Sequence, residues 1–151
     1  MIEQISTFFT IEMIYLWLNI GVIPFWFMLI VFPQSKVCGI FVTSIIPTFI
    51  LTSVYVYLLY IFFFAGYELY LSFYDLAELF ENNEFLILFW IHFLSINLFC
   101  GAWIVRDSQR FYISKIIIFF PLIITYFIGP LGLFIYWVIR IFFAKRITLF
   151  D

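Results

Sequence analysis

The sequence predicts an all-α integral membrane protein, a four-helix bundle that forms a single transmembrane domain over residues 1–151. Two observations support this prediction. Hydrophobic residues make up 67% of the chain and charged residues only 11%, whereas soluble domains have about half and a quarter. Seven Lys and Arg with nine Asp and Glu cannot give a domain of this size a polar exterior. The exterior is therefore expected to face lipid.

Four stretches are long and apolar enough to cross the hydrocarbon layer, which takes about 20 residues of helix. They cover residues 11–32, 37–64, 85–105 and 116–143. The connection between the first two is so short that they must form an antiparallel hairpin. The fourth stretch is long enough to span with a tilt or a break.

Prolines inside or near the spans predict kinked helices, since each removes a backbone hydrogen bond. They are Pro24, Pro47, Pro121 and Pro130. The sharpest kink is expected where Gly129 and Gly132 flank Pro130. Carbonyls freed inside a membrane need partners in protein or water, so this segment should face the bundle, either to improve packing or to shape a ligand site.

Residues 65–83, between the second and third spans, carry an acidic stripe among aromatic residues. Glu68, Asp75, Glu78 and Glu81 are separated by seven, three and three positions, which places them on one side of a helix. This pattern predicts an interfacial amphipathic helix. An extension of the second span beyond the membrane is the alternative.

The orientation follows from counting Lys and Arg near the span ends. With four spans, Lys36, Arg106, Arg110 and Lys115 share one side, and the three other cations share the opposite side with both termini. Four against three is a small excess. It favours a cytoplasmic position for the 106–115 connection.

Several classes of protein and site are disfavoured. A net charge of −2 offers no basic surface for nucleic acid. Cys38 and Cys100 lie in separate apolar runs and are expected to be reduced. No motif for a metal, a cofactor or a phosphate loop is present. The amino terminus lacks the basic region of a signal peptide and the composition of a transit peptide, so a bacterial inner membrane is the expected location.

The third span contains polar residues that are costly in lipid and therefore mark candidate functional positions. At 100° per residue, Asn97 and Gly101 lie on nearly the opposite side from a face that carries His92, Ser95, Ile96, Phe99, Trp103 and Arg110. This phasing suggests a central helix with neighbours on both sides. Asn97 is expected near mid-membrane, with Asp107 at the boundary.

Each polar residue has a catalytic and a structural interpretation. His92 could exchange a proton in a dry pocket, or it could be a neutral imidazole bonded to another helix. Asn97 could bind a ligand hydroxyl, although a hydrogen bond between helices is the simpler role. Asp107 lies near a helix C-terminus, where an acid needs a partner, and Arg110 three residues on is the nearest candidate.

The third span and the segment after it resemble the abscisic acid-deficient 4-like family of small four-helix membrane proteins. The resemblance rests on Trp90, His92, Leu94, Asn97, Leu98, Phe99, Gly101, Trp103, Ile104, Asp107 and Arg110, followed by Phe127, Ile128, Gly129, Pro130, Gly132, Leu133 and Tyr136. Pro24, Trp26, Pro33 and Pro47 fit the same pattern. It covers essentially all four spans.

The resemblance implies a role in carotenoid biosynthesis, because plant members are needed to form the allenic neoxanthin from the epoxide violaxanthin. That isomerisation removes a proton beside the epoxide and stabilises an alkoxide. We expect His92, Asp107 and Arg110 as catalytic residues, and Trp90, Asn97, Trp103, Gly129 and Pro130 as substrate-binding residues. The family is expected to have Asp where this chain has Asn97, so a carboxylate mechanism does not transfer to that position.

Two functions are compatible with these residues. The first is a membrane enzyme that isomerises or modifies a carotenoid or another isoprenoid. The second is a non-catalytic pigment- or lipid-binding protein or an assembly subunit, either as a homo-oligomer or in a membrane complex, with membrane lipids as its surroundings. A transporter is disfavoured because there is no inverted repeat or run of buried charge. A retinal-binding pump is disfavoured because no Lys lies deep within a span.

Overall fold

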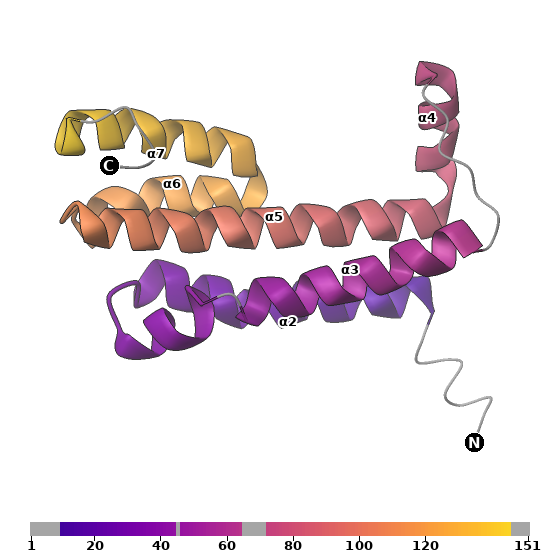
Figure 1. The fold of residues 1–151 in the computed structure, drawn as a ribbon, viewed down its shortest axis with the longest axis horizontal. Helices are drawn as coiled ribbons and strands as arrows, with labels where there is room; N and C mark the ends of the chain where they lie inside the picture. Colours follow the sequence, from indigo (N-terminus) through magenta and orange to yellow (C-terminus); the bar gives the residue numbers. More distant parts are fainter. Residues whose placement is uncertain (1–9, 45, 65–71, 146–151) are drawn as a thin grey trace. The chain divides into compact units, whose positions relative to one another are not determined.

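The computed structural model describes residues 10–44, 46–64 and 72–145 (Figure 1). Within these residues the chain has six α-helices, one π-helical turn and no strand. They are α2 (Ile11–Val31), η1 (Cys38–Val42), α3 (Ile46–Phe64), α4 (Phe73–Glu81), α5 (Asn83–Arg110), α6 (Lys115–Phe127) and α7 (Gly129–Ala144). The all-α class is confirmed, and the four-helix bundle is not.

Three segments of the described chain are long and apolar enough to cross a membrane. They are Ile11–Val31, Cys38–Phe64 and Asn83–Arg110, which correspond to the first three expected spans. α6 and α7 are apolar but shorter. The fourth expected stretch, residues 116–143, is not one continuous helix, because the chain breaks at Ile128 into α6 and α7.

Prolines explain where the second and fourth stretches break. Pro47 is the second residue of α3 and Pro130 the second residue of α7. Proline fits the first turn of a helix, where its missing N–H has no partner to lose. Both prolines therefore begin helices, whereas Pro24 and Pro121 lie inside α2 and α6.

Polar side chains define several helix starts. The Asn82 side-chain oxygen accepts hydrogen bonds from the backbone N–H groups of Glu84 and Phe85 at the beginning of α5. The Ser114 hydroxyl accepts one from Ile116 in α6. Such caps satisfy N–H groups that have no partner within the helix. They fix the beginnings of α5 and α6.

The acidic amphipathic helix expected within residues 65–83 is present as α4, and none of its residues is buried. Phe73 and Tyr74 are almost fully exposed. Residues 65–71, including Glu68, lie outside the described residues. Exposed rings beside Asp75 and Glu78 are the composition that an interfacial helix requires.

The contacts divide the chain into two compact units, residues 1–23 with 49–95 and residues 24–48 with 96–151. In the first unit, ring contacts join Tyr15 to Trp90, Tyr55 to His92 and Phe62 to Phe85. The beginnings of α2 and α5 therefore lie side by side, and the end of α3 lies beside the beginning of α5.

In the second unit, the later part of α2 packs against the later part of α5. The Trp26 ring fills the space beside Gly101, and the Gln109 side-chain amide donates a 2.6 Å hydrogen bond to the Pro33 carbonyl. α6 and α7 contact each other and run in opposite directions (Figure 1). They form a helical hairpin that packs on α5.

Candidate functional site

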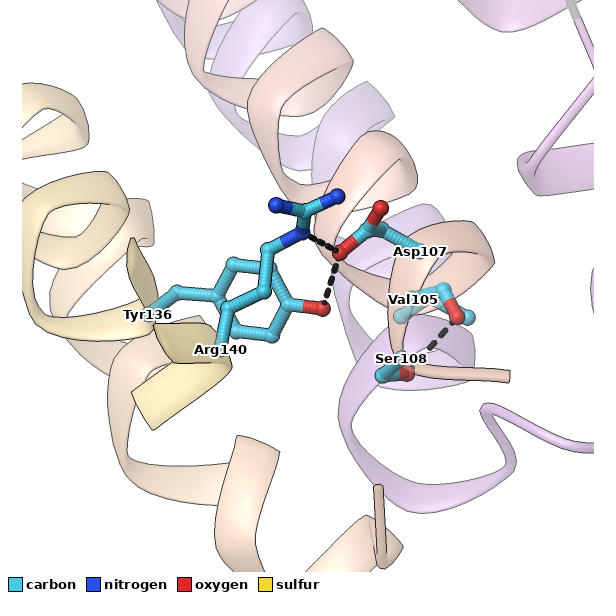
Figure 2. A network of polar contacts seen from close by, with 5 residues as sticks. All are labelled: Val105, Asp107, Ser108, Tyr136 and Arg140. Carbon is cyan, nitrogen blue, oxygen red and sulfur yellow. Dashed lines mark hydrogen bonds and ion pairs between the residues drawn. The ribbon is translucent and has the colours of Figure 1, made fainter. Parts of the chain in front are cut away.

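A buried charge pair joins α5 to α7 (Figure 2). The Arg140 Nε donates to Asp107 Oδ2 at 2.7 Å, and the Tyr136 hydroxyl donates to the same oxygen, also at 2.7 Å. Arg140 is 1% exposed, Asp107 7% and Tyr136 0%. We call these three residues the Asp107 cluster. Tyr136 and Arg140 are four residues apart, so they lie on one face of α7.

Aromatic rings enclose the Asp107 cluster. The Trp103 ring meets the Tyr136 ring edge-on, with centroids 5.7 Å apart. The Arg140 guanidinium lies 4.7 Å from the centre of the Phe111 ring and 5.8 Å from that of Trp137. Cation–π contacts of this kind strengthen when water is excluded. The rings therefore help to hold the guanidinium in an apolar surrounding.

The geometry of the Asp107 cluster is that of a closed electrostatic link. A buried carboxylate is stable when a cation and hydrogen-bond donors compensate it, and Arg140 and Tyr136 provide both. The Tyr136 hydroxyl proton is already engaged by Asp107. The cluster is thus built to fix α7 on α5, and a reacting atom would have to displace one of its bonds.

A second buried polar contact lies where α6 gives way to α7. Asn97, 2% exposed, donates from its amide nitrogen to the Tyr126 carbonyl at 3.5 Å. Its side-chain oxygen lies where a Cβ on Gly129 would be. The break between the two helices therefore packs directly on Asn97, and it does so because residue 129 has no side chain.

His92 and Arg110 lie at the surface of the described chain. His92 is exposed, and its ring centre is 5.6 Å from that of Tyr55. Ile96 and Phe99, on the same face, are also exposed, whereas Ser95 is buried. The described residues therefore cover the Asn97 face and leave His92, Ile96 and Phe99 uncovered. The exposed Arg110 has its guanidinium 5.7 Å from the Phe111 ring.

Trp90 lines a cavity of about 460 Å³ in the first unit. The other lining residues are Ile11, Glu12, Tyr15, Asn83, Leu86 and Ile87, so the cavity lies at the beginnings of α2 and α5. The Trp90 indole N–H is buried and has no hydrogen-bond partner among the described residues. A buried donor without a partner costs about 1–3 kcal/mol.

The sequence-predicted site residues fall into separate groups. Asn97 and Gly129 meet at the hairpin break, where Pro130 is exposed. Asp107 lies at the centre of the Asp107 cluster, and the Trp103 ring contacts Tyr136 of that cluster. Trp90 lines the cavity. Within the described residues, no group of three His, Cys, Asp or Glu is arranged to hold a metal ion.

Sequence reasoning did not assign a role to Tyr136 or Arg140. The ion pair that the structure shows for Asp107 is with Arg140, 33 residues away, on a different helix from the one that carries Arg110. A signal was available, because Arg140 is a lone cation in a long apolar run, and such residues usually pair inside the protein. Tyr136, one turn earlier, faces the same direction.

Long apolar helices joined by buried polar contacts, with an exterior rich in exposed Phe, Ile and Tyr, define a helical membrane protein. Comparison with known families is more specific. The ABA DEFICIENT 4-like family profile matches residues 13–136. The chain belongs to this family, as its motifs suggested. No curated protein and no solved structure matches it significantly.

Proposed function

We propose that the chain binds a carotenoid-like isoprenoid within the bilayer and isomerises its oxygenated end. Family membership supports the substrate class. The Trp90 cavity is the observation that carries the proposal. It is a mainly apolar space lined by the Glu12 carboxylate, the Asn83 amide and the Trp90 ring.

The depth of the cavity suits such a ligand. A polyene with an oxygenated ring at each end spans a bilayer with its polar ends near the two interfaces. The Trp90 cavity lies at the ends of two membrane-length helices, near residues 11 and 83. A volume of about 460 Å³ is within the usual range for small-molecule sites and accommodates one ring, with the polyene continuing along the apolar helices.

The lining residues can supply the elements of an epoxide-to-allene isomerisation. The Glu12 carboxylate accepts a proton from the polyene carbon beside the epoxide. The electrons of that C–H bond form the second double bond of the allene as the epoxide C–O bond breaks. The resulting alkoxide accepts a hydrogen bond from the Asn83 side-chain amide and then takes up a proton. No oxidant or reductant is needed, because product and substrate are isomers.

Expression in carotenoid-producing cells tests this proposal. We expect a pigment with the mass of its epoxide precursor and a new retention time in chromatography with mass detection. Glu12→Gln should abolish the product and Trp90→Phe should reduce it. Glu84→Gln, a matched change outside the cavity lining, should leave it. The His92→Gln, Asp107→Asn and Arg110→Gln variants test the sequence-based catalytic candidates in the same assay.

Unchanged pigments with all plausible epoxy and hydroxy substrates would overturn the enzymatic proposal. The second candidate is then a non-catalytic binding or assembly protein. It is favoured by exposed aromatic residues on the described helices, such as Trp17, Phe49 and Tyr57. Colour that copurifies without turnover would support pigment binding. A colourless protein in a stable homo-oligomer or heteromeric complex would support assembly.

A further inference from the structure

The contacts of the α6–α7 hairpin fix its register against α5. At the hairpin break, Asn97 meets Tyr126 and Gly129. At the other end, Asp107 meets Tyr136 and Arg140. The ten residue steps from Asn97 to Asp107 in α5 therefore lie alongside the eleven steps from Gly129 to Arg140 in α7. α7 runs parallel to the second half of α5, and α6 runs in the opposite direction.

The hairpin is too short to cross a bilayer. With a rise of about 1.5 Å per residue, the 13 residues of α6 and the 16 of α7 are about 20 and 24 Å long, against a hydrocarbon layer of about 30 Å. The break packs beside Asn97, the midpoint of the 28-residue α5. A hairpin whose tip is level with the middle of a spanning helix ends halfway across.

We propose that α6 and α7 form a re-entrant hairpin, so that the chain crosses the membrane three times and its carboxyl end returns to the side of the 110–115 connection. Non-helical backbone at this depth must be covered by protein. Here Asn97 donates a hydrogen bond to the Tyr126 carbonyl at the break. Gly132 allows the two helices to approach closely, since a Cβ there would lie 2.7 Å from the Pro121 carbonyl.

This topology changes the charge distribution across the membrane. Lys36, Arg106, Arg110 and Lys115 are now joined by Arg140 and Lys145, and by Arg146, which follows in the sequence. All seven cations lie at one side and none at the other, where the four-span arrangement gave four against three. The opposite side holds Glu12, Glu84 and the acids of α4. Because cytoplasmic loops are enriched in Lys and Arg, the carboxyl end faces the cytoplasm.

Labelling of single cysteines with a membrane-impermeant maleimide in intact cells tests the topology. In a background without Cys38 and Cys100, we place one cysteine by Tyr112→Cys, Lys145→Cys or Glu78→Cys, all at exposed positions. The re-entrant hairpin predicts that positions 112 and 145 stay protected until the cells are opened, while position 78 is labelled in intact cells. If positions 145 and 78 were both labelled in intact cells, they would lie on the same side of the membrane, and the chain would have a fourth span. Labelling of position 112 would overturn the orientation.

A second cavity lies on the side of the membrane that carries the cations. A cavity of about 450 Å³ opens between the α2–η1 connection and the α5–α6 connection, both in the second unit. Its lining includes Lys36, Gln34, Ser35, Gln109 and Ser114, and it contains no acid. The ammonium group and the side-chain amide and hydroxyl groups offer the donors that a phosphate oxygen accepts.

We infer that this cavity binds the phosphate of an anionic phospholipid headgroup. The cavity lies where the spanning helices α2 and α5 end, which is the depth of the headgroups, and the cytoplasmic leaflet is the anionic one. The lysine therefore faces a lipid of opposite charge.

Native mass spectrometry of the purified protein with phosphatidylglycerol, phosphatidylcholine or inorganic phosphate tests the lipid site. We expect phosphatidylglycerol to bind more tightly than phosphatidylcholine, and Lys36→Gln to weaken its binding about fivefold, as for one basic residue at a membrane surface. Lys145→Gln removes the same charge outside the cavity and should not weaken phosphatidylglycerol binding. Equal binding of both lipids, or no effect of Lys36→Gln, would overturn the site. Equally tight binding of inorganic phosphate would reassign it to a soluble anion.

Discussion

At the scale of single residues, the sequence identified Asp107 as an acid that needs a partner, but not which partner. Arg110 is the nearest cation at a helical spacing, whereas Arg140 and Tyr136 reach Asp107 only after α7 has folded back onto α5. Spacing predicts pairs within one helix. A pair between helices depends on how the chain turns, which residue spacing does not encode.

The Asp107 cluster should contribute strongly to stability. Asp107→Asn leaves the buried Arg140 without its counter-charge, and we expect it to lower the free energy of unfolding by about 3 kcal/mol or more. Thermal unfolding in detergent, followed by circular dichroism, measures the effect. Arg110→Gln, which removes an exposed cation near the same helix end, is the control. The double variant Asp107→Asn/Arg140→Gln should lose less than the sum of the single variants, and simple additivity would contradict the pair.

Two glycines offer a matched test of packing. A Cβ at Gly101 would lie 2.8 and 2.9 Å from carbon atoms of the buried Trp26 ring, whereas one at Gly21 would meet nothing within 4 Å. Gly101→Ala should therefore lower the unfolding temperature, with an overpacking cost of about 1–3 kcal/mol. Gly21→Ala should leave it unchanged or raise it, because alanine favours a helix over glycine. Equal shifts for the two variants would exclude close packing of Trp26 on Gly101.

At the scale of elements, the sequence located the apolar stretches to within a few residues and did not predict how two of them break. Pro130 between two glycines was read as a kink, and it is instead the second residue of a new helix. A proline that bends a helix and one that begins the next helix have similar surroundings in sequence. The choice here depends on Asn97, about 30 residues earlier, which packs on the break.

The hairpin break gives a prediction in which one glycine can be rescued and another cannot. Gly129→Ala would clash with the Asn97 side chain, so Asn97→Ala should recover part of the lost stability. Gly132→Ala would meet the Thr125 hydroxyl and also backbone atoms of Thr125 and Pro121, so Thr125→Ala, which removes only the hydroxyl contact, should recover little. Thermal unfolding of the two glycine variants and of the two double variants measures the lost and the recovered stability. Rescue of both glycines, or of neither, would show that the hairpin is not packed in this register.

At the scale of the whole molecule, composition alone predicted a membrane protein and the motifs alone predicted its family. The break within the fourth apolar stretch needed the structure. A count of four came from treating each apolar stretch as one helix, since hydropathy does not distinguish a spanning helix from a folded-back pair of short ones. In the re-entrant topology that we propose, three cations change sides relative to that count.

The charge distribution predicts how the orientation can be disturbed. Asp75→Lys/Glu78→Lys/Glu81→Lys places three cations on the side that has none, and we expect a detectable inverted fraction by cysteine labelling at position 145. The corresponding three changes to Gln remove the same acids without adding cations. They should leave the orientation intact, because acids contribute little to the rule. An identical response to both sets would show that orientation here does not depend on lysine and arginine.

The link between Asp107 and Arg140 also imposes an order of assembly. α7 leaves the ribosome after α5, and Arg140 can pair with Asp107 only when α5 is already in place. Before α7 is in place, Asp107 lacks its ion pair with Arg140. A chain that stops before Arg140 would leave Asp107 in this state permanently, so the buried end of α5 is completed only by residues translated about 30 positions later.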